Sequence, residues 1–137
     1  MNIRHDLLRF LLACSAAAAC CASASAYAQD DERSRQEIVH LLDYVAQQGC
    51  QFNRNGSWYD SKAAREHLRQ KYDYLQHRKL VPDANAFIER AASSSSMSGK
   101  AYLVRCGNGQ PVPSAQWLNA ELSRYRAAQP AETGVRK

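Results

Sequence analysis

Two cysteines, Cys50 and Cys106, constrain the fold of this chain more than any other feature of its sequence. The chain has 137 residues and five cysteines, but the other three lie in an N-terminal leader. Once such a leader is removed, an even pair remains, and an even pair in an exported domain is typical of one disulfide. Neither cysteine belongs to a C-x-x-C motif, and no histidine stands at a zinc-site spacing from either of them. A redox or metal pair is therefore the weaker alternative, and no metal ligands are predicted.

The leader has the three parts of a secretory signal peptide. Its start carries Arg4 and Arg9, an apolar alanine-rich stretch follows, and Ala26-Tyr27-Ala28 places small residues where signal peptidase needs them. We therefore expect cleavage after Ala28, removal of residues 1–28, and a location in the periplasm. Lipid attachment to a leader cysteine is a weaker alternative, because the Ala-x-Ala site is the cleaner match. No apolar run follows the leader, so no transmembrane span is predicted in the mature chain.

The rest of the chain has the composition of one small globular domain. Over all 137 residues the net charge is +5, and 45% of the residues are hydrophobic while 23% are charged, which is ordinary for a folded protein. Residues 29–128 are expected to form that domain, and residues 129–137 lose the pattern and are predicted to be a flexible tail. Lysines and arginines form no run, so nucleic-acid binding is not favoured.

The hydrophobic pattern changes from a helical to a β period at Gly49. Over residues 34–48 the apolar positions recur three and four apart, as in an amphipathic helix, and Gly49 is the expected C-terminal stop. Residues 50–59 then alternate around Asn55-Gly56. This pair tolerates the positive φ angles of a type I′ turn, so a β-hairpin is predicted.

The second half of the domain adds helices and one further strand. The expected elements are a helix over 62–79 capped by Ser61, a short helix capped by Asp83, a strand over 101–106, a loop over 107–113 and a helix over 115–127 capped by Ser114. A bond between Cys50 and Cys106 would bring the start of the hairpin close to the end of the later strand. The sequence therefore predicts an α+β domain, in which a small antiparallel sheet (the hairpin plus one later strand) packs with about four helices.

Three motifs, in this order, carry a resemblance to a known family. They are Phe52-x-Arg54-Asn55-Gly56, then Ala64-x-x-His67-Leu68-x-x-Lys71, and then a long run from Ala86-Phe87-Ile88 through Ser93-Ser94-Ser95-Ser96 and Gly99-Lys100 to Tyr102-x-Val104. Behind a signal peptide, they resemble the YfeK-like family of small exported bacterial proteins, a family of unknown function. The resemblance covers most of residues 36–125. It implies an envelope location in Gram-negative bacteria and brings no activity or cofactor, and the cysteine pair is not a general family feature.

The polar centres of these motifs supply the candidate ligand-binding residues. They are Arg54, Asn55, Gly56, His67, Lys71, Ser94, Ser95, Ser98, Gly99, Lys100 and Tyr102. The serine-rich loop offers hydroxyls, backbone N–H groups and one cation, which suit a phosphate, a carboxylate or a sugar. His67 and Lys71 share a helix face, and if the hairpin folds back on it, Arg54 joins them in a basic cluster suited to an anion. The structural alternative is that the serines bond to local backbone. In the same alternative, Asn55-Gly56 only makes the turn, and Arg54 and His67 bond to backbone or to carboxylates.

The preferred function is a non-catalytic binding or accessory domain for an unidentified envelope ligand or protein. One alternative is a small hydrolase that pairs a loop serine with His67, and another is a structural partner that assembles through the basic helix 62–79. An enzyme is less favoured, because the chain has no G-x-S-x-G elbow and its acids are scattered and mostly surface-like. No cofactor is expected.

Overall fold

The structure, a computed structural model, describes residues 19–130, with side chains from residue 26 onward. The chain divides after Glu32, and the folded unit discussed below begins at Arg33. The elements are α1 (Ala19–Gln47), β1 (Gln51–Arg54), β2 (Ser57–Tyr59), α2 (Ser61–His77), α3 (Ala84–Phe87), the π-helical turn η1 (Ile88–Ala92), β3 (Leu103–Arg105), β4 (Val112–Pro113) and α4 (Ser114–Ala128).

The two predicted terminal segments lie mostly outside the described residues. Of the predicted signal peptide, residues 1–18 are not described, and α1 runs through Ala28 in this uncut chain, so cleavage there stays a prediction. Of the predicted tail, the structure describes only Gln129 and Pro130. No helix in the described range 19–130 combines the length and the apolarity needed to cross a membrane.

The four described strands form one antiparallel sheet in the order β2-β1-β3-β4. The hairpin pairs Arg54 with Ser57 across Asn55 and Gly56, whose φ angles of 53° and 88° suit the predicted tight turn. On the other side of β1, β3 places Val104 opposite Phe52. With helices packed on this sheet, the predicted α+β fold is confirmed.

The sequence pattern does not predict one of the strands, β4. β4 lies inside the predicted loop 107–113 and pairs Val112 with Val104 and Pro113 with Leu103. Two residues are too few to show an alternation, and a proline has no N–H for a ladder, so the pattern does not reveal this edge strand. The predicted strand over 101–106 is shorter than expected, and Ala101 forms only an isolated bridge with Ser94.

Two predicted helix caps are also wrong. Asp60, one residue before the predicted cap, accepts a hydrogen bond from the Ala63 N–H at 2.8 Å and starts α2. Ser61 instead donates its hydroxyl to the carbonyl of Cys50 at 2.8 Å. Ser114 is the first residue of α4 rather than its cap, and no side chain caps that helix. Both serines are buried in the folded unit. The general preference of serine for N-cap positions therefore does not predict their positions here.

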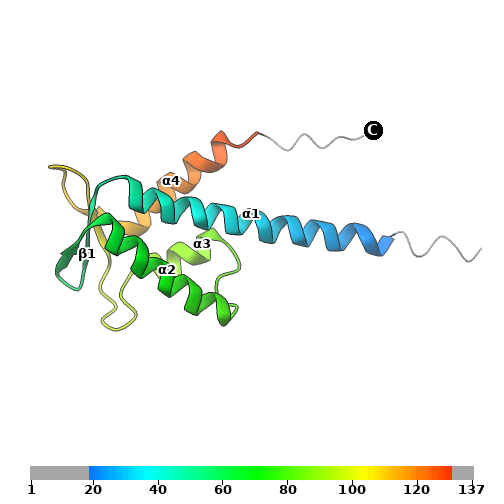
Figure 1. Cartoon of the computed structure of the whole chain (residues 1–137), viewed down its shortest axis with the longest axis horizontal. Coiled ribbons are helices and arrows are strands. Elements are labelled where there is room, and N and C mark those ends of the chain that lie inside the picture. Colours follow the sequence, from blue (N-terminus) through cyan, green and yellow to red (C-terminus); the bar gives the residue numbers. More distant parts are fainter. Residues whose placement is uncertain (1–18, 131–137) are drawn as a thin grey trace, which may run out of the picture. The chain divides into compact units, whose positions relative to one another are not determined.

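The core of this unit lies between the helices and one face of the sheet. α1 contributes the predicted stripe Ile38, Leu41, Leu42 and Val45, all at most 5% exposed. Because strand side chains alternate, Phe52 and Val104 point to the same face, and both are buried. The turn η1, which continues α3, packs against α2 and α4 and brings Ile88 into the same core, and Figure 1 shows α3 next to α2.

The predicted disulfide between Cys50 and Cys106 is present, with the two Cα atoms 4.3 Å apart. It joins the residue before β1 to the residue after β3, so it fastens neighbouring strands at the same end. In the chain-entropy model, closing a loop with a sequence separation of 56 contributes about 4 kcal/mol to stability. The hairpin is thereby held against β3, and this pairing positions the candidate site.

Candidate functional site

The inner face of the sheet places two polar side chains beneath α2. Arg54 lies two residues after Phe52 on β1, and Tyr102 lies two residues before Val104, so both point to the same side as the core. His67 and Lys71, one helical turn apart on α2, face them.

Direct contacts join these four residues, which we call the basic cluster. The guanidinium Nη1 of Arg54 lies 2.8 Å from Nδ1 and 3.2 Å from Nε2 of His67. The Tyr102 hydroxyl lies 3.2 Å from His67 Nε2 and 3.4 Å from Lys71 Nζ. The hairpin therefore folds back on the helix, which is the condition under which the sequence predicts that Arg54 joins His67 and Lys71. The role of the four residues in ligand binding stays a prediction.

The cations of the basic cluster have neutral partners. Lys71 Nζ donates to the carbonyl of Ser94 at 3.0 Å and lies 5.1 Å from the centre of the Tyr102 ring. Arg54 lies 5.1 Å from the centre of the Tyr59 ring. Among the described residues, no carboxylate contacts either cation. The cluster thus holds positive charge that the protein itself does not neutralise.

The surroundings shift the pKa values of the cluster in the directions expected for crowded, partly buried bases. Burial, followed by the positive charges of Arg54 and Lys71, lowers the pKa of His67. Burial and then Arg54 likewise lower the pKa of Lys71. For Tyr102, burial raises the pKa although Arg54 opposes the shift. An anion placed here would favour the charged forms of both bases.

A pocket of about 390 Å³ opens beside the basic cluster. Buried side chains form its floor, namely Phe52, Ala64, Leu68 and Ser114, and Arg54, His67 and Tyr102 also line it. At the exposed edge, Glu66 is hydrogen bonded by Arg69 and Gln70, which lower its pKa to about 2. This carboxylate is therefore already paired outside the cluster.

The serine-rich loop is tied to the tip of the hairpin. The Asn55 amide donates to the hydroxyl of Ser95 at 3.3 Å and accepts from the hydroxyl of Ser98 at 2.5 Å. The hydroxyl of Ser95 also accepts from the backbone N–H groups of Met97 and Ser98. The bonds to Met97 and Ser98 are local backbone contacts of the kind that the structural alternative expects. The two bonds of Asn55 instead join side chains that are 40 and 43 residues apart, and they tie the loop to the hairpin turn.

The remaining predicted site residues have conformational roles or stand apart. Gly56 and Gly99 adopt positive φ angles of 88° and 69°, which glycine allows at no steric cost. Ser94 reaches the cluster through its carbonyl rather than its hydroxyl. Lys100 is exposed, and no hydrogen bond or ion pair joins its side chain to the basic cluster among the described residues.

The two alternative functions find little geometric support. His67 contacts Arg54 and Tyr102, and no serine hydroxyl bonds to it in the described part of the chain, so no Ser–His pair is formed. On α2, Arg65 pairs with Asp43 at 3.1 Å and Arg69 with Asp73 at 2.8 Å. The basic faces predicted for helix 62–79 are therefore partly neutralised by neighbouring acids.

A family model described as a family of unknown function, DUF5329, matches residues 32–126, a span that contains the basic cluster and the whole pocket. The chain belongs to this family. Uncharacterized protein YfeK of Salmonella typhimurium strain LT2 is 35% identical over 78 residues, which are 56% of this chain and 63% of that protein. The predicted YfeK-like relationship is thereby confirmed. No solved structure matches the DUF5329 chain.

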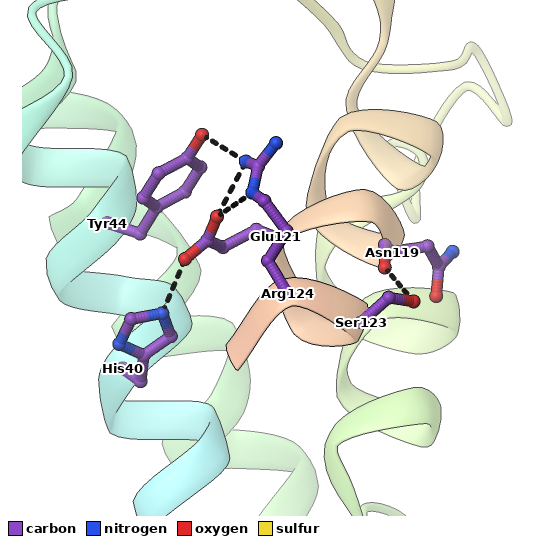
Figure 2. A network of polar contacts seen from close by, with 6 residues as sticks. All are labelled: His40, Tyr44, Asn119, Glu121, Ser123 and Arg124. Atoms are coloured by element: carbon purple, nitrogen blue, oxygen red, sulfur yellow. Dashed lines mark hydrogen bonds and ion pairs between the residues drawn. The ribbon is translucent and has the colours of Figure 1, made fainter. Parts of the chain in front are cut away.

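Sequence reasoning misses a second polar group of this DUF5329 domain, which we call the acid–base network. Glu121 on α4 accepts from His40 Nε2 at 2.7 Å and from Arg124 Nη2 at 2.6 Å, and Arg124 also donates to the Tyr44 hydroxyl at 2.9 Å (Figure 2). Burial opposes ionisation of Glu121, but these hydrogen bonds outweigh it and lower the pKa of the carboxyl. The network joins α1 to α4.

A second pair extends the acid–base network along the same helices. Glu37, only 5% exposed, receives two hydrogen bonds from Arg126, at 2.7 and 2.6 Å. The expectation that the acids are mostly surface-like is therefore wrong for Glu37 and Glu121. The position of Glu37 next to Ile38, a residue of the apolar stripe, is a sequence signal that this carboxylate is buried. The sequence does not indicate its partner, Arg126, which lies 89 residues away. Among residues 19–130, no group of three His, Cys, Asp or Glu side chains gathers as a metal site requires.

Proposed function

We propose that this protein is a non-catalytic binding domain of the bacterial cell envelope that holds an anionic ligand at the basic cluster. The observation that carries the proposal is that Arg54 contacts His67, while His67 and Lys71 contact one phenol, that of Tyr102. No carboxylate of the described residues contacts either cation, Arg54 or Lys71. Placing like charges together, partly out of water, costs free energy in the empty protein. A bound carboxylate or phosphate offsets that cost.

The accessible part of the cluster is the guanidinium of Arg54. It lines the pocket, and a planar guanidinium can give two parallel hydrogen bonds to a carboxylate or a phosphate. Lys71 lies behind the Tyr102 hydroxyl, so it acts on a ligand through its charge and by orienting that hydroxyl. The envelope location is supported by the leader and by the YfeK-like relationship.

Titration calorimetry tests the anion site directly. The purified protein is titrated with inorganic phosphate, with acetate, with peptidoglycan fragments and with vesicles that contain an anionic lipid. We expect at least one of these anions to bind, and Arg54→Gln to weaken its binding by about ten- to a hundredfold, the usual range for a charge-assisted hydrogen bond.

Arg105→Gln is the matched control for this titration. Arg105 also lies on the sheet and stacks on an aromatic ring, Trp58, at 4.3 Å from the ring centre, but it is outside the pocket. Equal effects of Arg54→Gln and Arg105→Gln, or binding that neither substitution changes, would contradict the assignment of the site.

The envelope location has a separate test. The full-length chain with a C-terminal tag is expressed in a Gram-negative host, and the cells are fractionated. We expect the tag in the periplasmic fraction and Gln29 as the N-terminal residue of the processed protein. A cytoplasmic chain that retains Met1 would contradict this part of the proposal.

A further inference from the structure

The floor of the pocket differs sharply from its charged wall. Phe52, Ala64 and Leu68 line it with apolar side chains that are each less than 9% exposed. The polar exception is Ser114, which is 2% exposed and lines the same pocket. A ligand on this floor therefore meets apolar surface and one hydroxyl-bearing side chain.

The basic groups are gathered at one part of the lining, whereas the carboxylate of Glu66 lies at the exposed edge and is paired with Arg69 and Gln70. Arg54 and His67 are in direct contact, and the Tyr102 hydroxyl lies against His67, so a single anionic group can reach all three. A bare inorganic anion uses only this part. The pocket, at about 390 Å³, falls in the range of sites that take small organic molecules, and a bare anion would leave the floor without a partner.

From this arrangement, and resting on the proposed function, we infer that the natural ligand is an organic acid whose single anionic head is joined to an extended apolar body. The head lies against Arg54, His67 and the Tyr102 hydroxyl, and the body covers Phe52 and Leu68. Ser114 offers its hydroxyl to a polar atom that the body carries. Affinity then has two separable parts, one from the charged head and one from the apolar area that leaves water.

A series of simple probes separates the two parts. Acetate, butanoate, octanoate and 1-octanol are titrated in parallel into the purified protein. Because each buried methylene contributes about a three- to fourfold gain in affinity, octanoate is expected to bind at least a hundredfold more tightly than acetate. 1-Octanol has the body without the charge, and we expect it to bind at least tenfold more weakly than octanoate.

Arg54→Gln and Arg105→Gln complete the experiment, after circular dichroism melting shows that both variants are folded. Arg54→Gln is expected to bring octanoate down to the affinity of 1-octanol, whereas Arg105→Gln leaves it unchanged. If acetate or phosphate binds as tightly as octanoate, the inference that the ligand has an apolar body is refuted, whereas the proposed anion site is not. If 1-octanol equals octanoate and Arg54→Gln has no effect, or if no acid binds, both the inference and the proposed function fail.

Discussion

The basic cluster and the acid–base network lie in one folded unit, yet they treat charge in opposite ways. In the acid–base network, each of the two buried carboxylates meets an arginine, Glu37 with Arg126 and Glu121 with Arg124. In the basic cluster, Arg54 contacts a histidine and an aromatic ring instead. Charges that serve only stability are normally paired when buried. The unpaired cluster is therefore the region where, on the proposed function, stability is exchanged for ligand binding.

The first prediction concerns Glu37, whose two oxygens are both bonded by Arg126. Glu37→Gln removes one charge of a pair that is buried on the acid's side and 39% exposed on the arginine's side, so we expect a loss of about 2 kcal/mol in the free energy of unfolding. Urea denaturation followed by circular dichroism measures it. Arg33→Gln is the control, because Arg33 is exposed and lies 3.7 Å from the same carboxylate. A loss for Glu37→Gln no larger than for this control would refute the contrast.

The second prediction concerns Glu121, the acid at the centre of the acid–base network. Its pKa is lowered in the folded protein, so the unfolded chain binds the proton first as the pH falls. The stabilisation is present above the ordinary carboxyl value of 4.5 and is lost as the pH drops below it. Glu121→Gln should cost about 1 kcal/mol at pH 7 and should flatten the pH dependence of stability between pH 5 and pH 3. An unchanged slope in denaturation curves over this interval would contradict the assignment.

The third prediction moves to the basic cluster and to binding. Burial, Arg54 and Lys71 lower the pKa of His67, so this side chain is neutral at pH 7 in the empty protein. A bound anion raises that pKa, and binding therefore takes up a proton and tightens as the pH falls from 7 towards 5. Glu66, with a pKa of about 2, stays ionised throughout and does not contribute.

Octanesulfonate is the probe for this effect, because its own charge does not change in the interval. We expect a few-fold gain in affinity between pH 7 and pH 5 for the natural sequence and a flat profile for His67→Gln. Loss of affinity on acidification, or the same gain in the variant, would show that His67 is not the titrating group.

The fourth prediction concerns the smallest expected effect, the change in the free energy of unfolding caused by Arg54→Gln. It contrasts most strongly with the loss expected for Glu37→Gln. Arg54→Gln removes a cation that contacts no carboxylate among the described residues, so the free energy of unfolding should change by less than about 0.5 kcal/mol or should rise. The measurement is the same urea denaturation. A loss of 2 kcal/mol or more would make the basic cluster a second structural network and would remove the distinction between the two regions.

The parts of the fold and site that the sequence predicts are those with short-range signals. The alternation around Asn55-Gly56 and the helical spacing of His67 and Lys71 are local, and they suffice to bring Arg54 to the helix once the hairpin folds back. The Cys50–Cys106 bond follows from counting cysteines after the leader.

The parts that the sequence does not predict depend on distant partners. Glu37 and Arg126 are 89 positions apart, and the sequence around either residue does not indicate that it pairs with the other. Ser114 looks like a helix cap, but it is buried as the first residue of α4 and lines the floor of the pocket. Such roles are decided by which elements pack together, and packing is a property of the whole chain.

The Asn55-Gly56 turn is also a site at which the protein can change chemically during storage. Asparagine followed by glycine is prone to spontaneous deamidation: the backbone nitrogen of the glycine attacks the side-chain amide, ammonia leaves, and water opens the resulting cyclic imide to give a carboxylate. At Asn55 the change removes the N–H that is donated to Ser95 and creates a negative charge next to Arg54 in the chain. A stored sample would thus contain molecules with a carboxylate at position 55, beside the basic cluster. The measured affinity for an anion would then depend on how long the protein had been stored.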